Sequence, residues 1–209
     1  MSTQLLLKSI VLFVLLSTTL VGYVILMDYS SRPGPEAEVL STITEDELTQ
    51  FSGHKQGRPT IVLFYHPKCP CTFATVRSLE RLSMRFHNEP QIHAVAYCPE
   101  NKTDVWIESR TTSSLRSLPG SRVHIDREGR MCQQFGVTTS GHILVYDSDG
   151  HLTFSGGTTS SRGHEGDCAA SQELVRIVNS ETTAIDVCTK SPVFGCSILE
   201  IEERNSDEG

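Results

Sequence analysis

A short apolar stretch followed by two cysteines constrains the fold of this chain more than any other feature. Residues 61–65, Ile-Val-Leu-Phe-Tyr, are β-branched or bulky and apolar, which is typical of a buried strand. Pro67 ends this strand, because proline cannot donate to a sheet ladder. Over residues 73–86 apolar side chains recur every three or four positions, which predicts an amphipathic helix. Cys69 and Cys71 therefore lie where a buried strand turns into a helix.

The two cysteines are placed where thiolates are stabilised. Pro70 suits the first position of a helix, where its missing N–H costs nothing. A helix N-terminus carries partial positive charge and unpaired N–H groups, which favour thiolate over thiol. Lys68 adds a full positive charge beside Cys69 and Cys71. This stretch is therefore suited to thiol chemistry.

An uncharged segment near the N-terminus predicts a membrane anchor. Residues 9–27 carry no charge and, at ~1.5 Å per helical residue, would span roughly 28 Å, close to the thickness of a bilayer's hydrocarbon core. The apolar region of a cleavable signal peptide is usually shorter, about 7–15 residues. Lys8 precedes the segment and acidic residues dominate after it, so the positive-inside rule places residues 1–8 in the cytoplasm. We therefore predict a single-pass signal anchor in the cell inner membrane, with the soluble domain in the periplasm.

Composition argues against one class of function, nucleic-acid binding, and the positions of the cysteines indicate an oxidising compartment. The chain has 209 residues, a net charge of −7 and 38% hydrophobic residues, which allows one ordinary domain with additions. No basic stripe is present to neutralise phosphates, which argues against nucleic-acid binding. All seven cysteines follow the predicted anchor and so lie in a compartment where thiols tend to pair. Because seven is odd, at least one cysteine is free, metal-bound or paired with another molecule.

The elements expected after the anchor alternate between strand and helix. Residues 28–43 are expected to be a polar linker, and Thr44 is expected to cap a short helix. Further strands are predicted at 91–97, 123–125, 142–147 and 151–155, and further helices at 103–118, 130–135 and 171–179. Strand–helix–strand units followed by a hairpin and a covering helix predict a three-layer α/β domain over residues 44–179. Residues 180–209 are left as a cysteine-containing acidic tail.

Three thiols are expected along one edge of this predicted sheet. In such sheets ligands bind beyond the carboxyl ends of the strands. Cys69 and Cys71 follow the first strand, and Cys98 follows the second. Cys98 is therefore a candidate secondary thiol, able like Cys71 to resolve a mixed disulfide formed by Cys69.

The chain resembles the thioredoxin-like superfamily over about residues 44–178. The strand, Cys-Pro-Cys and helix unit carries this resemblance, together with the segment from Phe135 to Gly150. More narrowly, the chain is similar to the RedB-like group of membrane-anchored bacterial proteins. The motifs that carry this likeness are His66-Pro-Lys-Cys-Pro-Cys71, Thr139-Ser-Gly-His142, the segment Ser161 to Asp167, and Pro192-Val-Phe-Gly-Cys196. The resemblance implies a thioredoxin-like three-layer sandwich with an N-terminal transmembrane helix and a C-terminal extension.

The chain departs from the thioredoxin pattern in two places. Thioredoxins carry two cysteines separated by two residues, whereas here one proline separates them. Aligning the Pro-Cys pairs puts Cys71 at the resolving position and Lys68 where the nucleophile would be, so the attack would pass to Cys69. Ser140 and Gly141 stand where thioredoxins have a cis-proline beside the active site. Loss of that proline removes a substrate-docking surface and is expected to open space beside the thiols.

Three functions compete for this site. The first is thiol–disulfide exchange in which Cys69 attacks and Cys71 or Cys98 resolves; a disulfide between residues i and i+2 closes a tight ring, and strain makes it easier to reduce. The second is binding of copper or zinc by Cys69, Cys71 and His142, because two thiolates and an imidazole suit both metals. The third is a non-catalytic domain that binds a partner protein. We predict the first, a membrane-anchored periplasmic thiol–disulfide oxidoreductase without a cofactor, acting on a protein thiol or disulfide.

Two further groups of residues are candidate site or structural elements. In the segment 161–168, Arg162 or His164 would reach the thiol edge and hold an anion or a thiolate, or else the segment is a loop whose Asp167 caps the last helix. Cys188 and Cys196 are expected to form a disulfide that pins the tail and stabilises the fold by ~2–3 kcal/mol.

Overall fold

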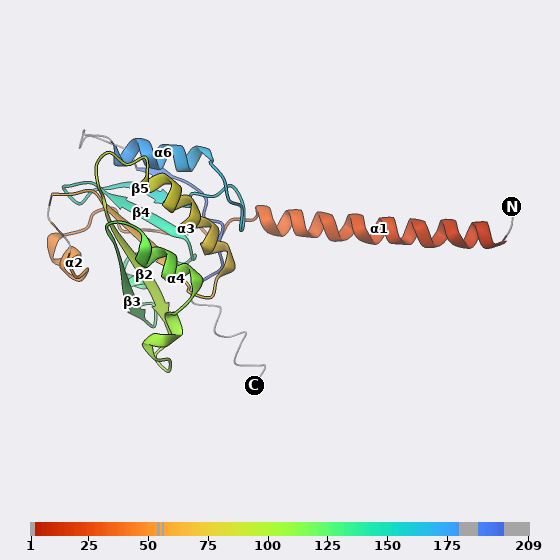
Figure 1. Ribbon diagram of the computed structural model, residues 1–209, viewed down its shortest axis with the longest axis horizontal. Coiled ribbons are helices and arrows are strands. Elements are labelled where there is room, and N and C mark those ends of the chain that lie inside the picture. Colours follow the sequence, from red (N-terminus) through yellow and green to blue (C-terminus); the bar gives the residue numbers. More distant parts are fainter. Residues whose placement is uncertain (1–2, 54, 56, 180–187, 199–209) are drawn as a thin grey trace. The chain divides into compact units, whose positions relative to one another are not determined.

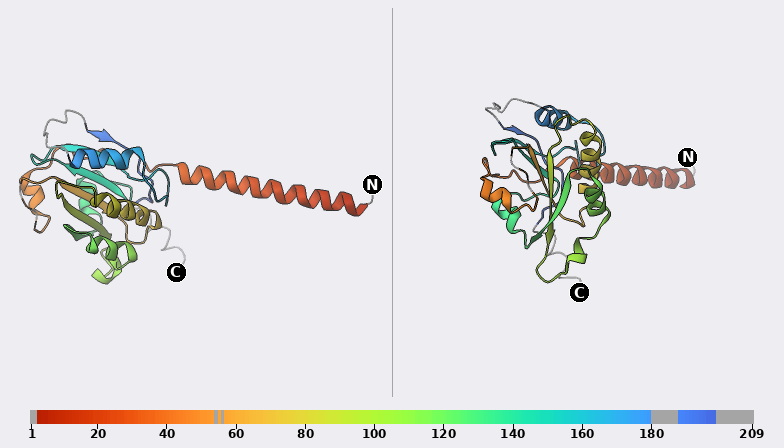
Figure 2. Two further views of the ribbon diagram at one scale, coloured as in Figure 1. Left: turned by 45° about the horizontal axis from the view of Figure 1, so that its top comes forward. Right: turned by 60° about the vertical axis from the view of Figure 1, so that its left-hand side comes forward.

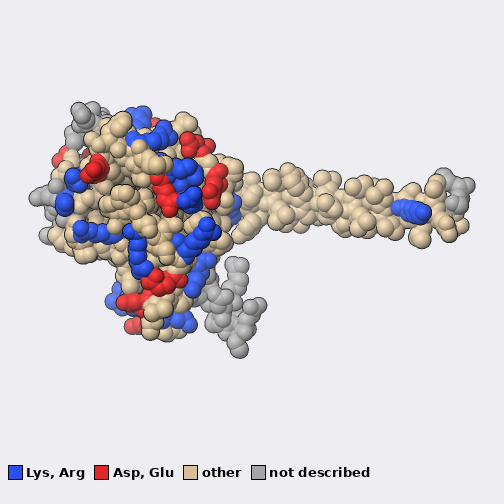
Figure 3. All heavy atoms as spheres, in the orientation of Figure 1, with Lys and Arg blue, Asp and Glu red and all other residues tan. Residues whose placement is uncertain are grey.

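The computed structural model describes residues 3–53, 55, 57–179 and 188–198, and it divides the chain into two compact units, Met1–Arg32 and Pro33–Gly209. The first unit is the helix α1 (Thr3–Ser31), which is long and apolar enough to cross a membrane. It continues beyond the predicted span at both ends, because no proline interrupts it before Pro33. Figure 3 shows α1 without charged side chains over most of its length. Membrane anchors and signal sequences both contain apolar helices of this kind.

The second unit is built on a six-stranded sheet with the strand order β3-β2-β1-β4-β5-β6 (Figure 1). β1 pairs in parallel with β2, β2 pairs in parallel with β3, and β4 runs antiparallel to both β1 and β5. All six residues of β1 are buried, as expected for a central strand that is covered on both faces. The strands are β1 (Thr60–Tyr65), β2 (Gln91–Cys98), β3 (Ser121–Arg127), β4 (His142–Tyr146), β5 (Leu152–Gly156) and β6 (Thr189–Lys190).

Helices cover both faces of the sheet and complete three layers (Figures 1 and 2). Leu63 of β1 faces a core cluster that includes residues of α3, α4 and α6, whereas Phe64 faces a second cluster that includes residues of α2 and α5. The predicted three-layer α/β architecture is thus confirmed. The helices are α2 (Glu45–Thr49), α3 (Pro70–Ser83), α4 (Arg110–Ser117), α5 (Arg130–Gln134), α6 (Ala169–Val178) and the 3₁₀ helix η1 (Asp104–Ile107).

Local capping explains where the helices differ from the sequence-based expectation. Thr44 caps α2 as predicted, in a capping box with Glu47. The single helix predicted over residues 103–118 is instead two, η1 and α4, because the Ser109 side chain accepts a hydrogen bond from the Thr112 N–H and starts a new helix. The predicted cap at Asp167 is wrong: the residue that caps α6 is Cys168.

The segment before the domain is bound to it more closely than a free linker would be. Within the predicted linker 28–43, residues from Pro33 onward belong to the second unit. The Gly34 N–H donates to the Val193 carbonyl oxygen at 2.8 Å, and the Leu152 N–H donates to the Ser41 carbonyl oxygen at 2.9 Å. Residues 33–43 therefore form part of the domain surface.

The C-terminal part of the chain returns to the sheet. β6 pairs in parallel with β5, and residues 191–198, which we call the return segment, continue from it along the domain. The Ile198 N–H donates to the Thr138 carbonyl oxygen at 2.8 Å, and the Ile198 side chain is fully buried in the second core cluster. The remainder of the predicted acidic tail, residues 180–187 and 199–209, lies outside the described residues.

Candidate thiol site

Cys69 lies at the bend between β1 and α3. It is the N-cap residue of α3, with extended backbone angles, and Pro70 opens the helix at the position expected from the sequence. The Cys69 N–H donates to the His66 carbonyl oxygen at 3.0 Å, which closes the turn after the strand. The side chain is only 3% exposed. The sulfur atom is therefore held at a helix N-terminus and largely removed from water.

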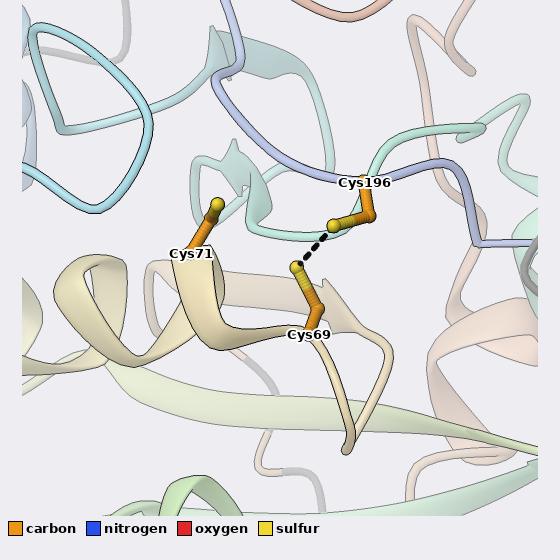
Figure 4. Close-up of side chains that lie close together, drawn as sticks. All are labelled: Cys69, Cys71 and Cys196. Atoms are coloured by element: carbon orange, nitrogen blue, oxygen red, sulfur yellow. Dashed lines mark hydrogen bonds between the residues drawn. The ribbon is translucent and has the colours of Figure 1, made fainter. Parts of the chain in front are cut away.

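A third cysteine lies beside the two that the sequence places there. The Sγ atoms of Cys69 and Cys196 are 3.1 Å apart, and the Sγ atoms of Cys69, Cys71 and Cys196 all lie within 4.8 Å of one another. Figure 4 shows the side chains of Cys69 and Cys196 pointing toward each other, with Cys71 beside them on the first turn of α3. Cys196 belongs to the return segment, 127 residues further along the chain than Cys69. No local pattern connects these two positions.

Backbone contacts fix the position of Cys196. The Ser140 N–H donates to the Cys196 carbonyl oxygen at 2.8 Å, and Thr139 forms an antiparallel bridge with Ser197. Arg162 donates from its guanidinium group to the carbonyl oxygen of Gly195. The return segment is therefore attached on both sides of Cys196, which sets the direction of the cysteine side chain.

The hydrogen bonds among the three thiols concentrate negative charge on Cys69. Its pKa is lowered, because the thiols of Cys196 and Cys71 and the Thr72 hydroxyl stabilise the thiolate more than burial disfavours it. The pKa of Cys196 is raised, because its proton is held in hydrogen bonds with Cys69 and Cys71. The bond with Cys196 lowers the pKa of Cys71, yet the bond with Cys69, burial and the negative charge of Cys69 raise it overall. Among the three thiols, Cys69 is thus the one whose pKa is lowered.

The positive charge beside the thiols comes from Arg162 rather than from Lys68. The Lys68 side chain is exposed, and its Nζ atom lies 5.5 Å from the centre of the Trp106 ring. Its charge contributes to lowering the pKa of His66 and is not among the causes of the low pKa of Cys69. The positive charge that acts on a thiol is that of Arg162, which lowers the pKa of Cys71. Of the two candidates in the segment 161–168, Arg162 reaches the site.

The remainder of the segment 161–168 lies on the surface. His164 is exposed, and its backbone N–H bonds to the Ser161 carbonyl oxygen. Asp167 lies 3.6 Å from the Arg85 guanidinium, and Glu165 lies 3.9 Å from that of Arg81, so two exposed ion pairs join the loop to α3 and the turn after it. His164 is not among the residues that contact the three thiols.

His66 is a site residue that the sequence did not single out. Its side chain is 1% exposed and packs on Tyr97 and Trp106, with ring centroids 5.5 and 5.3 Å away. Burial lowers the pKa of His66 to about 4, while the charge of Cys69 opposes the shift. The Lys68 N–H donates to Nδ1 at 3.1 Å, so the neutral ring carries its proton on Nε2, which has no hydrogen-bond partner among the described residues.

Cys98 and His142 are not in the group of three thiols. Cys98 is fully buried at the end of β2, and its Sγ accepts a hydrogen bond from Arg127 at 3.3 Å. The His142 imidazole is 4% exposed, and its Nε2 lies 2.9 Å from the Ser155 Oγ on the neighbouring strand β5. The predicted metal-ligand set that included His142 is therefore wrong in its third member, because the group of donors that the structure brings together contains Cys196 instead.

The predicted disulfide between Cys188 and Cys196 is also not present. Both residues are free thiols, and Cys196 faces Cys69. Cys188 directly precedes β6, and its Sγ contacts the Thr189 carbonyl oxygen at 3.6 Å. The return segment leads from β6 to the carboxyl end of β1, where Cys196 lies. Cys188 stays beside β6, so the two cysteines lie at different places in the domain.

No protein-family model and no curated protein matches the sequence, whereas solved structures do. The structure is similar to an uncharacterised conserved protein of Geobacillus kaustophilus, with a TM-score of 0.55 and 14% identity over 81% of this chain and 90% of that chain. For the hypothetical protein SMc02350 of Sinorhizobium meliloti 1021, the TM-score is 0.51 and the identity 16%, over 80% and 94%. A secreted Mycobacterium tuberculosis disulfide oxidoreductase homologous to E. coli DsbE has a TM-score of 0.40 and 19% identity, over 59% and 81%. The likeness to the first two structures shows that this chain shares their fold.

The loop before β4 lies beneath the return segment. The Ser140 Oγ accepts a hydrogen bond from the His66 N–H at 2.8 Å and lies 2.6 Å from the Thr72 Oγ1. Gly141 has a φ of +93°, and a Cβ added there would lie 3.0 Å from the Thr75 Oγ1, so a side chain would be both strained and crowded. Gly141 therefore packs against α3.

The space expected beside the thiols is filled by the chain itself. A proline at position 140 would have no N–H, whereas the Ser140 N–H holds the Cys196 carbonyl. Ser140 therefore provides the hydrogen bond that docks the return segment. The expectation of open space is corrected by this contact.

Proposed function

We propose that this protein is a membrane-anchored thiol–disulfide oxidoreductase of the periplasm, with Cys69 of the Cys-Pro-Cys motif as its nucleophile. The observation that carries the proposal is the position of the Cys69 sulfur, at the N-terminus of α3 and within 4.8 Å of two further thiols. Hydrogen bonds from those thiols lower the pKa of Cys69, and the thiolate is the reactive form of cysteine.

The reaction needs no cofactor. The Cys69 thiolate attacks one sulfur of a partner disulfide, forms a mixed disulfide and releases the other partner sulfur as a thiolate. A second thiol of the site then loses its proton and attacks the Cys69 sulfur, which expels the remaining partner sulfur. The partner disulfide has then gained two electrons and two protons, one proton from the second thiol and one from water, and the site holds one disulfide. The reverse sequence oxidises a partner dithiol.

The anchor and the periplasmic location rest on α1. This helix is long and apolar enough to span a bilayer, and Lys8 lies on its leading side. In cells whose outer membrane is permeabilised, we expect a membrane-impermeant maleimide to label the half-buried cysteines of the domain, such as Cys168 and Cys188. Labelling that requires rupture of the inner membrane would contradict the proposed orientation.

The activity is tested with the full-length protein in detergent. The measured quantity is the rate at which the protein, kept reduced by dithiothreitol, reduces a fluorescence-quenched glutathione disulfide. Cys69→Ser should lower this rate to that of the uncatalysed reaction, because it removes the nucleophile. Cys188→Ser is the matched control and should retain the rate, because Cys188 lies outside the group of three thiols. Equal rates for wild type and Cys69→Ser would refute the proposal.

A second candidate function is binding of a soft metal ion by the same three thiols. Copper(I) and zinc both prefer thiolate ligands, and the Sγ atoms of Cys69, Cys71 and Cys196 are close enough together to share one ion. This candidate predicts copper or zinc in anaerobically purified protein, lost in Cys196→Ser and retained in His142→Ala. Protein that contains no metal and shows normal exchange activity would remove this candidate.

A further inference from the structure

We propose that Cys196, in the return segment, is the thiol that resolves the mixed disulfide formed on Cys69. This inference rests on the proposed function, because it assigns the second step of the same exchange reaction. It differs from the assignment that the motif alone suggests, in which Cys71 resolves.

The first argument is the direction of the side chains. Cys71 lies two residues after Cys69, on the first turn of α3, so a disulfide between these two residues would close a tight ring. Cys69 and Cys196 come from different segments and point toward each other (Figure 4). Their sulfurs are 3.1 Å apart, about 1 Å longer than the roughly 2.05 Å of a disulfide bond. A small movement of the Cys196 side chain is enough to form the bond.

The second argument is that the position of Cys196 is built into the fold. The segment is fixed by the hydrogen bond from Ser140 to the Cys196 carbonyl, by the bridge between Thr139 and Ser197, and by the buried side chain of Ile198. A thiol held in this way acts at a high effective concentration on the sulfur that it faces. Cys196 therefore competes well against a free thiol for the mixed disulfide on Cys69.

The third argument is the burial of Cys69. Its side chain is 3% exposed, and the return segment is hydrogen-bonded to the backbone of the loop before β4. A partner disulfide reaches Cys69 when the return segment moves away from Ser140, and the segment brings Cys196 back to the same sulfur as it returns. One opening and closing movement of residues 191–198 thus serves both steps. The opening admits the partner disulfide to Cys69, and the closing brings Cys196 back to the Cys69 sulfur.

The chemical step is balanced without any further reagent. Cys196 loses its proton, and its sulfur attacks the Cys69 sulfur of the mixed disulfide. The bond between Cys69 and the partner breaks, the partner leaves as a thiolate that takes up a proton, and a disulfide joins Cys69 to Cys196. Both cysteines are oxidised, and the partner disulfide is reduced to two thiols. A dithiol such as dithiothreitol returns the site to the starting state.

The test traps the mixed disulfide on Cys69. Reduced full-length protein in detergent is mixed with glutathione disulfide and quenched with acid, and the glutathione adduct on Cys69 is quantified by peptide mass. In wild type and in Cys71→Ser the adduct should be minor, because Cys196 removes it. In Cys196→Ser the adduct should rise at least about tenfold, because the high effective concentration of the resolving thiol is lost. Cys188→Ser is the matched control and should resemble wild type.

Two outcomes would contradict different parts of the account. Accumulation in Cys71→Ser together with clearance in Cys196→Ser would assign the resolving role to Cys71 and overturn this inference, while the proposed function would stand. The double variant Cys71→Ser, Cys196→Ser retains only the nucleophile of the group and should hold the adduct on Cys69. If Cys69 carries no adduct in the double variant under conditions that label Cys188, the proposed function itself fails.

Discussion

Gly195 packs directly on the carbonyl group of Ser140, so closely that a Cβ at position 195 would overlap the carbonyl oxygen. This approach of two backbones lets the Ser140 N–H reach the Cys196 carbonyl at 2.8 Å. Only glycine leaves room for it. The arrangement of the thiols therefore depends on a glycine that carries no reactive group.

Replacing this glycine should release the return segment. In Gly195→Val the added side chain would meet the Ser140 carbonyl, and we expect Cys69 to become at least about tenfold more accessible to iodoacetamide, since local opening would no longer limit the reaction. The measurement is the alkylation time course of the Cys69 peptide near pH 9, where the thiolate is abundant even at an ordinary cysteine pKa. Gly57→Asn is the control, because no atom lies within 4 Å of an added Cβ there and asparagine tolerates the φ of +76° at this position. An unchanged rate in Gly195→Val would show that the segment does not cover Cys69.

Ser140 should contribute to stability as well as to the site. Ser140→Ala removes the acceptor of the buried His66 N–H and the partner of the Thr72 hydroxyl. We expect a loss of about 1–3 kcal/mol in the free energy of unfolding, because a buried donor is left unpaired. Denaturant unfolding measures this change. Ser83→Ala serves as the control and should stay within about 0.5 kcal/mol, because the Ser83 hydroxyl bonds only within its own helix turn.

The pH dependence of the alkylation of Cys69 should depend on the neighbouring thiol of Cys196. Cys196 is the main cause of the low pKa of Cys69. In Cys196→Ala we therefore expect the midpoint of the alkylation rate of Cys69 against pH to move upward, toward the ordinary cysteine value of about 8.5. Cys188→Ala should leave the midpoint in place. A midpoint that stays low in Cys196→Ala would assign the shift to the helix N-terminus and Cys71 instead.

The stability of the domain should fall on the acid side of neutrality. Burial lowers the pKa of both His66 and His142 to about 4, below the value of about 6.5 in an unfolded chain. Between these pH values the unfolded state binds more protons, so stability decreases as the pH falls from about 6.5 to about 4. His142→Gln should make this loss in the free energy of unfolding smaller by up to ~3 kcal/mol. His151→Gln, at an exposed position, should not; equal slopes for both variants would contradict the assignment.

Local patterns predicted the part of the site that is local in sequence. The apolar run of β1 and the proline at the start of α3 each act within a few residues, and each lies where expected. The bend that holds Cys69 and Cys71 follows from these features alone. Prediction succeeded there because strand, turn and helix start are determined by neighbouring residues.

The third thiol depends on contacts that no local pattern carries. Cys196 reaches Cys69 only because β6 pairs with β5 and Ile198 fills a core position, and both contacts join segments far apart in the chain. Spacing instead favoured a disulfide from Cys196 to its nearest cysteine in sequence, Cys188. His66 was missed for a similar reason, since its burial arises from Tyr97 and Trp106 on other elements.

The most direct test of the three-thiol site is the disulfide map of the oxidised full-length protein. The protein is oxidised with a small excess of glutathione disulfide, quenched with acid to prevent exchange, and digested for peptide mass analysis. The account predicts a peptide in which Cys69 is bonded to Cys196, with Cys188 outside that bond. A map in which Cys196 is bonded to Cys188, leaving Cys69 without a partner in the site, would contradict it.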